Sequence, residues 1–520
     1  MTRCTGVPAR RRAVLALRAL LVCVWCACAA VHLAAGQQCP DGTPPPCPGA
    51  AAAPHPAPRS IAVLTFENTS RDTAARYLAE GLADQITTRL GAVARLTTIS
   101  RTAVRRLRNP EQLSVQQLGR TLNAAYLVNG SLRAAGGRVR VNVEALRAAT
   151  GELVWSSAFD RASDDLIGIE EAVAMEVAAG VGGRLSPQER RVLGGSVTAS
   201  SAAYTDFLRG NVLLAWRTAA SLQGAIAAYR AATVADSGFA DGFARLAYAY
   251  ALCAFWNCGA EADSLLWYSR DAATRALRLN ARSSDAWMGR AYLLTVWSYG
   301  GGVLADDSLL AALAAFRRAV ELNPRNDEAW HQYGATLQFV NDSASVDALR
   351  RALALDPARA VTYLDLSFTY YIMGSNDRAL ATVDTARALE PDGPFHAQRA
   401  LYLLAAGDTA GAVADARLSP GALWNPLVLG AFAHDSALAR AMEQWLVAHP
   451  SCTGVDGLGD LYLLWTGRRE QAVQRLIGCR SSLWTRYLLR MPVNAPLAVD
   501  PRIQALRAES ERILARAQWR

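Results

Sequence analysis

Two stretches of this 520-residue chain decide its fold: "FRRAVELNPRNDEAW", from Phe316 to Trp330, and "LRRALALDPARAVTY", from Leu349 to Tyr363. A looser echo, "VDTARALEPDGPFH", starts at Val383. Each stretch contains the end of an amphipathic helix, then a Pro preceded by Asn, Asp or Glu, and then the start of a new segment with an aromatic residue. Such a recurrence predicts a stack of similar helical units.

The prolines of these stretches set the period, because Pro324, Pro357 and Pro391 lie 33 and 34 residues apart. A period near 34 residues is typical of the tetratricopeptide repeat, in which each unit is a pair of antiparallel helices. Proline lacks an amide donor and therefore ends the second helix of a unit. The unit that follows the repeat pattern best carries Tyr363, Leu366, Ser367, Tyr370, Ala379, Val383, Ala386 and Pro391.

One helix pair cannot bury its apolar stripe alone, so the units must stack. We therefore predict an all-α tetratricopeptide (TPR) solenoid over residues 201–520, with a pattern that is degenerate after about residue 392. Near the end of the chain, Asp500 is the expected N-cap of a last helix that starts at Pro501. The charged outer face of this helix suits the end of a solenoid.

A different periodicity precedes the repeats, over residues 60–190. The apolar run "IAVLTF" (Ile61 to Phe66) predicts a buried strand, and apolar residues every four positions predict a helix up to Leu90. In "RVRVNVEAL" (138–146), strict alternation predicts a strand with one buried and one wet face. Gly136-Gly137 suits a tight hairpin turn, because both positions need positive φ. We predict an α/β sandwich-like domain: a mixed sheet with an antiparallel meander and flanking helices.

Residues 60 to about 185 also resemble a known module. The order and spacing of "SIAVLTFENTSRDTAARYLAEGLADQITTRL", "LTTISR", "AAYLVNGSLRAAGGRVRVNVEALRAATGELVWSSAFDR" and "IEEAVAMEV" are similar to the TolB-like, or FlgO-like, amino-terminal domain. The resemblance implies an α/β fold and a periplasmic or envelope setting, often ahead of helical repeats. It implies no established enzymatic activity.

The N-terminus indicates export. Arg10 to Arg12 precede the apolar run "ALLVCVWCACAAV" (Ala19 to Val31), and small residues follow at Ala34 and Gly36. This pattern is typical of a signal peptide over residues 1–36, and the alternative is an uncleaved signal anchor. We expect a periplasmic or cell-envelope protein; in the alternative, the chain is anchored in the inner membrane with its bulk in the periplasm.

Two segments have the composition of connectors. Residues 37–59 are rich in Pro and Ala and are expected to form a semi-extended tether. Residues 191–200, which include "GGS", are expected to link the α/β domain to the solenoid.

Cysteine usage fits an oxidising compartment. Outside the signal, the chain has an even number of cysteines, arranged as three local pairs. We interpret them as candidate disulfides, with buried free thiols as the alternative, and no neighbouring His completes a zinc site. The candidates are Cys39 with Cys47, Cys253 with Cys258, and Cys452 with Cys479.

Several classes of chemistry have no support in the sequence. All 54 basic residues are Arg, which excludes a Walker A lysine or a lysine Schiff base. The six histidines are scattered, and no nucleophile elbow or glycine-rich phosphate loop occurs. We predict no catalytic, cofactor or metal site and therefore no enzyme.

The charge of the chain does not indicate nucleic-acid binding. The formal net charge is +9, but five arginines and no acid lie in the first 36 residues, so 9 − 5 leaves about +4 for the rest. The densest basic run, "SRTAVRRLR" (100–108), is interpreted as a solvated helix face, and contact with phosphate or anionic lipid is the alternative. Membrane contact is expected only if the N-terminal segment stays uncleaved.

The best candidate surface is the inner face of the solenoid, built by the first helix of each unit. Exposed aromatic side chains on this face would bind an extended or helical peptide, unless neighbouring helices cover them. Some tetratricopeptide proteins hold a peptide carboxylate with Lys and Asn at these positions, and this chain has neither residue type there. The candidate partner-binding residues are Tyr292, His331, Gln338, Phe368 and Tyr371.

These observations predict a non-enzymatic envelope scaffold. Its repeats would mediate protein–protein interaction, and its TolB-like domain would dock to an envelope partner. The alternative is a membrane-anchored sensor or regulatory module whose α/β domain binds a small ligand. The start of the mature chain separates the two, because a start near Gln37 would remove the anchor.

Overall fold

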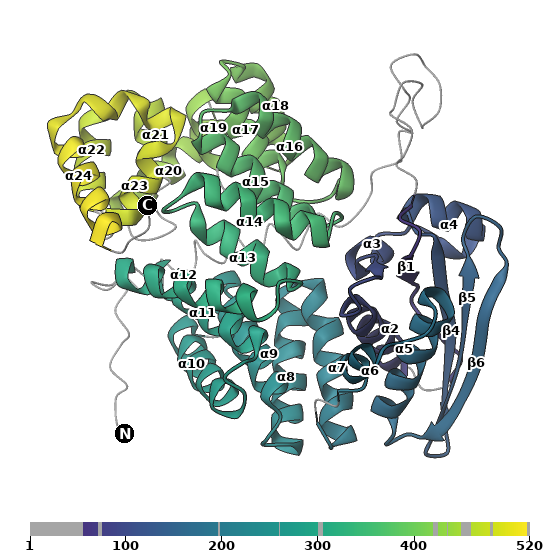
Figure 1. Ribbon diagram of the computed structural model, residues 1–520. Coiled ribbons are helices and arrows are strands. Elements are labelled where there is room, and N and C mark those ends of the chain that lie inside the picture. Colours follow the sequence, from purple (N-terminus) through teal and green to yellow (C-terminus); the bar gives the residue numbers. More distant parts are fainter. Residues whose placement is uncertain are drawn as a thin grey trace, which may run out of the picture.

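The computed structural model describes residues 56–70, 75–195, 198–258, 261–299, 305–419, 425–433, 435–448, 459–478 and 482–516. A small α/β part comes first, and a long all-helical part follows it (Figure 1). The predicted signal over residues 1–36, the tether up to residue 55, and Cys39, Cys47, Cys452 and Cys479 lie outside the described residues.

The α/β part is built on one mixed sheet. Strand order is β3-β1-β4-β5-β6, with β2 paired to β4, and β1 runs parallel to both of its neighbours. The last three strands form the antiparallel meander that the alternation predicted. Gly136 and Gly137 connect β4 to β5 with φ values of 58° and 73°. The strands are β1 (Ser60–Val63), β2 (Glu67–Asn68), β3 (Thr97–Thr98), β4 (Tyr126–Ala135), β5 (Arg138–Arg147) and β6 (Leu153–Ala162).

Helices cover the sheet unevenly. Long helices α2 (Ala75–Gly91) and α5 (Leu166–Gly182) bury one face, including the alternate valines of β5. Short helices α3 (Arg101–Arg105) and α4 (Val115–Leu122) enclose a smaller cluster with Ala62 of β1 and Leu127 of β4. On β5, the side chains between the valines are exposed, so this part of the sheet keeps one wet face.

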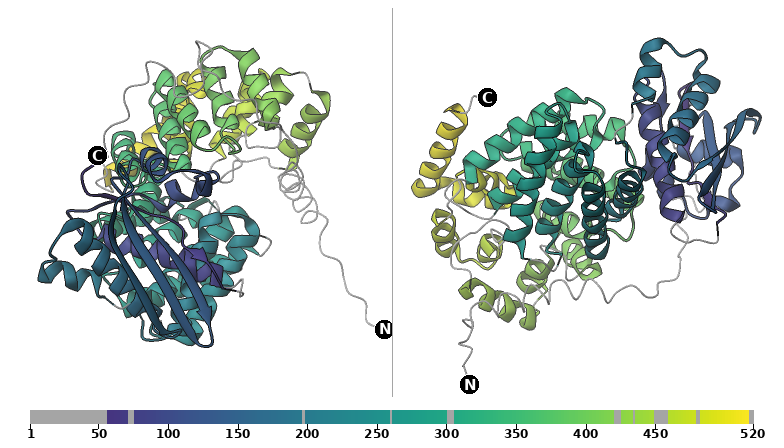
Figure 2. Two further views of the ribbon diagram at one scale, coloured as in Figure 1. Left: turned by 90° about the vertical axis from the view of Figure 1, so that its right-hand side faces the viewer. Right: turned by 90° about the horizontal axis from the view of Figure 1, so that it is seen from below.

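The remaining helices run as antiparallel pairs, and each pair packs on the next, so the predicted helical solenoid is confirmed (Figures 1 and 2). The helices are α7 (Ser201–Trp216), α8 (Ala219–Ala235), α9 (Ala240–Trp256), α10 (Ala262–Leu279), α11 (Ser284–Tyr299), α12 (Ala305–Leu322), α13 (Asp327–Leu337), α14 (Asp342–Leu355), α15 (Ala360–Ile372), α16 (Asn376–Leu389), α17 (His396–Ala405), α18 (Thr409–Leu418), α19 (Asn425–Phe432), α20 (Ser436–Ala448), α21 (Gly459–Trp465), α22 (Arg469–Ile477), α23 (Ser482–Arg490), η3 (Pro492–Val499) and α24 (Pro501–Arg516).

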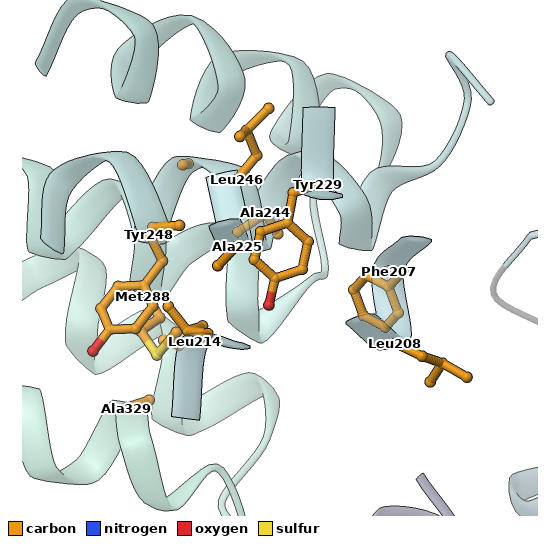
Figure 3. Close-up of a cluster of buried hydrophobic side chains, with 14 of the residues drawn as sticks. Phe207, Leu208, Leu214, Ala225, Tyr229, Ala244, Leu246, Tyr248, Met288 and Ala329 are labelled. Carbon is orange, nitrogen blue, oxygen red and sulfur yellow. The ribbon is translucent and has the colours of Figure 1, made fainter. Parts of the chain in front are cut away.

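Small and large residues alternate in the solenoid core as helix packing requires. A Cβ atom on Gly334 of α13 would lie 2.6 Å from Cγ of Leu349 on α14, so only glycine permits this approach. Between neighbouring pairs, large side chains such as Phe207, Tyr229 and Tyr248 fill the space, as Figure 3 shows. The last helix begins at Pro501, and the Asp500 carboxylate accepts the backbone N–H of Arg502, so the predicted cap is confirmed.

The two parts of the chain share one hydrophobic core. Helix α2 packs against α7, and a Cβ atom on Gly81 would lie 2.9 Å from Cβ of Leu208. Between them, α6 (Pro187–Leu193) starts with a capping box from Ser186 to Glu189 and buries Leu193 completely. The first residues of the predicted linker are thus helical and packed.

Among the described helices, none is both long and apolar enough to cross a membrane.

Candidate functional site

The inner face of the solenoid, made by α7, α9, α11, α13 and α15, carries a network of charged and polar side chains centred on Glu328. The Glu328 carboxylate accepts hydrogen bonds from Arg217 at 2.7 Å and from Arg359 at 2.5 Å. Tyr248 donates its hydroxyl to Glu328 at 2.6 Å. Burial alone would raise the pKa of Glu328, but the two arginines hold it well below its usual range.

The network continues along α13 and α15. His331 lies with Nε2 2.8 Å from Oδ2 of Asp365 and with Nδ1 3.8 Å from Glu328. Burial lowers the pKa of His331, but its bonds to Asp365 and Glu328 more than offset this, and the pKa is raised. Gln338 then donates to the Asp365 backbone carbonyl at 2.8 Å and to Thr369 at 3.0 Å. Polar groups therefore connect α7, α9, α13 and α15.

Aromatic rings form the far end of this face. Phe368 lies 5.9 Å from Tyr371, and Tyr371 lies 5.0 Å from Tyr402, measured between ring centroids. Tyr487, from the C-terminal helix α23, lies 5.6 Å from Phe368. A segment more than 100 residues further along the chain thus reaches the inner face.

All five predicted partner-binding residues belong to α11, α13 and α15 or to the position just after α13, and their side chains are buried. Their exposed fractions are 7% for Tyr292, 2% for His331, 5% for Gln338, 6% for Phe368 and 0% for Tyr371. Neighbouring helices cover them, as the alternative interpretation held. A role for them in binding a partner stays a prediction.

The partly exposed groups of the inner face are charged residues that the sequence analysis missed. The side chains of Arg217, Arg245, Asp285 and Asp365 are between 24% and 28% exposed. Arg245 pairs with Asp285 at 2.9 Å, between α9 and α11. These residues recur near the start or end of first helices, and that position in the repeat was the available signal.

The basic run at 100–108 is not a solvated face. Arg101 is 9% exposed and donates to Asp84 at 2.6 Å and to the Val63 carbonyl at 2.5 Å. Arg105 pairs with Glu80 at 3.0 Å. The solvated-face interpretation is therefore wrong for these two arginines, because the acidic residues of α2 face them. Arg106 reaches the solenoid, at 2.9 Å from Glu390.

Cys253 and Cys258 are both buried free thiols at the end of α9. The backbone N–H of Cys258 donates to the Cys253 carbonyl at 3.1 Å, so the two residues adjoin. The structure therefore has the alternative, buried free thiols, at this pair, while disulfides at the other two pairs stay a prediction.

The two histidines inside the described ranges, His331 and His396, each lie beside acidic side chains. His396 lies 3.1 Å from Asp415, and His331 lies between Asp365 and Glu328. In the part of the chain that the structure describes, no group of three or more His, Cys, Asp or Glu side chains is arranged to hold a metal ion. His434 and His449 lie outside that part.

Sequence comparison gives two partial matches with known proteins. A family model described as "HilA/YgeH-like transcriptional regulator, second domain" matches residues 57–174. A curated protein of Rhizobium meliloti (strain 1021), named "Putative adenylate cyclase 3", is 30% identical over 218 residues. That match covers 40% of this chain and 36% of the relative, so the chain spans about a third of the relative's length.

Solved structures are similar to the helical part. One is TTC0263, a TPR protein of Thermus thermophilus: it is 18% identical, with a TM-score of 0.34, over 39% of this chain and 100% of that one. Another is pilF of Pseudomonas aeruginosa, which is 17% identical, with a TM-score of 0.31, over 42% of this chain and 96% of that one. Similarity at this level carries no information about partners.

Proposed function

We propose that this chain is a non-enzymatic scaffold whose helical repeats bind a segment of a protein partner on the inner face. The observation that carries the proposal is the inner-face network, in which Glu328, Arg359 and their neighbours are fixed by mutual hydrogen bonds across three helix pairs. Such a surface is already ordered before a partner arrives, so binding costs little side-chain entropy. Its partly exposed charges have both signs, which favours a polar peptide over an apolar ligand.

The α/β part is proposed to dock to an envelope partner. Its support is the wet face of β5, where Arg138, Arg140 and Asn142 point away from the core, together with the resemblance to envelope modules. The export pattern of residues 1–36 supports a periplasmic setting.

A regulatory module is the second candidate, favoured by the match of residues 57–174 to a domain of transcriptional regulators. In this case the N-terminal segment stays in the membrane and the α/β domain binds a small ligand. Mass spectrometry of the mature N-terminus tests it. A start near Gln37 contradicts the anchored form, and an intact Met1 supports it.

The name of the Rhizobium relative suggests a specific test of the non-enzymatic proposal. Purified full-length chain is incubated with ATP and Mg²⁺ or Mn²⁺, and cyclic AMP is measured. We expect no formation above a heat-inactivated control. Formation that scales with the amount of intact protein would overturn the proposal.

Capture with the full chain tests the scaffold itself. Asp365→Arg reverses a partly exposed charge of the inner face, and Asp384→Arg reverses a charge that is 47% exposed on α16. Each variant and the wild type is immobilised and exposed to envelope extract, and helical content is checked by circular dichroism. We expect Asp365→Arg to lose at least one captured protein that Asp384→Arg keeps. Identical captured sets would contradict the proposal.

A further inference from the structure

Helix α23 lies against the start of α12 and the turn that joins α13 to α14. The backbone N–H of Leu483 donates to Asp306 at the start of α12, at 3.1 Å. Arg486 donates to the Phe339 carbonyl at 3.2 Å, and Arg490 donates to Asp342 at 2.6 Å. Figure 1 shows the C-terminal helices folded back beside α14. One short helix therefore contacts the start of α12 and the turn after α13.

In this contact, two arginine side chains of α23 bind backbone carbonyls just after the C-terminal end of α13. Helix α13 ends at Leu337, so the carbonyls of Gln338 and Phe339 project beyond it without helical donors. Arg490 donates to the first carbonyl and Arg486 to the second. The negative end of a helix dipole favours cations there. These are contacts to backbone, which any suitably placed arginine pair can make.

An aromatic side chain anchors the helix between the two arginines. The ring of Tyr487 is stacked on Phe339 at 4.5 Å and lies 5.6 Å from Phe368 of α15. Leu488 and Leu489, next in the chain, are each 2% exposed. The contact therefore has the composition of a binding hot spot, with a central aromatic ring and flanking arginines.

A solvent-open hollow lies beside the seat of α23. A hollow of about 470 Å³ adjoins the arginine contacts and is lined by Asp342, Met373, Arg486 and Glu511. Met373, on its rim, is 45% exposed. Water that reaches the arginine contacts weakens them, because their charges are then partly screened. The arginine side of the contact is thus open to solvent, whereas its leucine side is buried.

We propose that α23 is a built-in ligand of the solenoid, and that the partner presents an amphipathic helix of the same pattern: Arg, an aromatic residue directly after it, and a second Arg four positions beyond the first. The partner's helix replaces α23 at the start of α12 and on the turn after α13. This inference rests on the proposed scaffold function and adds the class of partner. A tethered segment competes at an effective concentration of about 1 mM, so the resting chain resists weak partners.

The test uses the full chain and a labelled synthetic peptide, residues 482–499, whose binding is followed by fluorescence anisotropy. In the chain variant Arg486→Ala/Arg490→Ala, the built-in helix is weakened. We expect this variant to bind the peptide at least 10-fold more tightly than the wild type. The same two substitutions placed in the peptide should abolish binding to the variant.

Arg512→Ala is the matched control in the chain. Arg512 is 63% exposed and pairs within α24, with Glu509, so this variant should bind the peptide as the wild type does. Equal affinity of the wild type and the double variant would overturn the inference, as would equal binding of the substituted peptide. If the double variant loses helical content, Tyr487→Ala replaces it with the same expected result.

The outcome is separable from that of the proposed function. Peptide exchange that fails, while Asp365→Arg still loses a captured protein, overturns only this inference. Peptide exchange that succeeds, while capture is insensitive to Asp365→Arg, shows that α23 is displaceable and counts against the proposed function.

Discussion

The hydroxyl of Tyr204 donates a hydrogen bond to the carboxylate of Glu170, and this bond joins the first helix of the solenoid to the α/β part. Glu170 is completely buried and also accepts from Arg89 of α2. Burial raises the pKa of Glu170 to about 7, although Arg89 opposes the rise. The two parts of the chain therefore share polar groups as well as a hydrophobic core, and we expect them to unfold together.

Removing the shared hydroxyl tests that junction. In Tyr204→Phe, Glu170 keeps Arg89 but loses a buried donor, which costs about 1–3 kcal/mol. Urea denaturation should show one transition at a lower midpoint. Tyr268→Phe, at a residue that is 58% exposed, is the control and should leave the midpoint unchanged. Two separate transitions in the wild type would contradict joint unfolding.

Stability should fall as pH rises from about 5 to about 8. Burial raises the pKa of Glu170 and of Asp460 to about 7, against the opposing effect of Arg89 and Arg475. Their unfolded pKa values are about 4, so the folded state holds protons that the unfolded state has released. This contribution is fully present below the unfolded pKa and is lost as pH rises through about 7. The raised pKa of His331 acts in the same direction.

The corresponding control is Glu170→Gln, which stays neutral; its amide oxygen can accept from Arg89, and its amide NH2 can donate to the oxygen of the Tyr204 hydroxyl. Its unfolding free energy should depend less on pH than that of the wild type, by on the order of 1–3 kcal/mol across this window. Denaturant titrations at pH 5, 6, 7 and 8 measure the slope. If the unfolding free energies of the two proteins change with pH in parallel, Glu170 does not titrate between pH 5 and 8.

The inner-face network should be intolerant of losing one charge. Arg359 bridges Asp327, Glu328 and Asp356, so Arg359→Ala leaves buried Asp356 without this cation and Glu328 with Arg217 alone, and it should cost about 3–5 kcal/mol. Arg318→Ala removes an exposed pair with Glu321 on one helix and should cost less than about 0.5 kcal/mol. Thermal unfolding of both variants gives the comparison. Equal melting temperatures of Arg359→Ala and Arg318→Ala would mean that solvent already screens the charges of the inner-face network.

Glycine at the crossing of α13 and α14 should be required. In Gly334→Ala, the new Cβ would overlap Leu349, and overpacking of this kind costs about 1–3 kcal/mol. The higher helix propensity of Ala than of Gly offsets up to about 1 kcal/mol of this cost. Gly195→Ala, where no atom lies within 4 Å of the new Cβ, is the control. A melting temperature at or above the wild-type value would show that the helices separate without cost.

Most of the fold followed from local sequence patterns. Proline spacing predicted the helix pairs, because proline ends a helix wherever it stands, and alternation in 138–146 predicted a strand with one wet face. Contacts between distant segments were not predictable in this way. The bond from Arg490 to Asp342 spans 148 residues, and neither residue type indicates its partner. Leu193 was assigned to a linker because the glycines after it obscured a short helix with a buried apolar side chain.

Site-specific photo-cross-linking in cells tests the central claim, that the inner face binds a protein partner, most directly. Ala335 of α13 is partly exposed and lies seven and four residues after Glu328 and His331, hence on the same helix face. A benzophenone amino acid at Ala335 should give a discrete higher-mass adduct with another protein, and the same group at exposed Arg351 on α14 should give none. No adduct from Ala335, or equal adducts from both positions, would contradict the account.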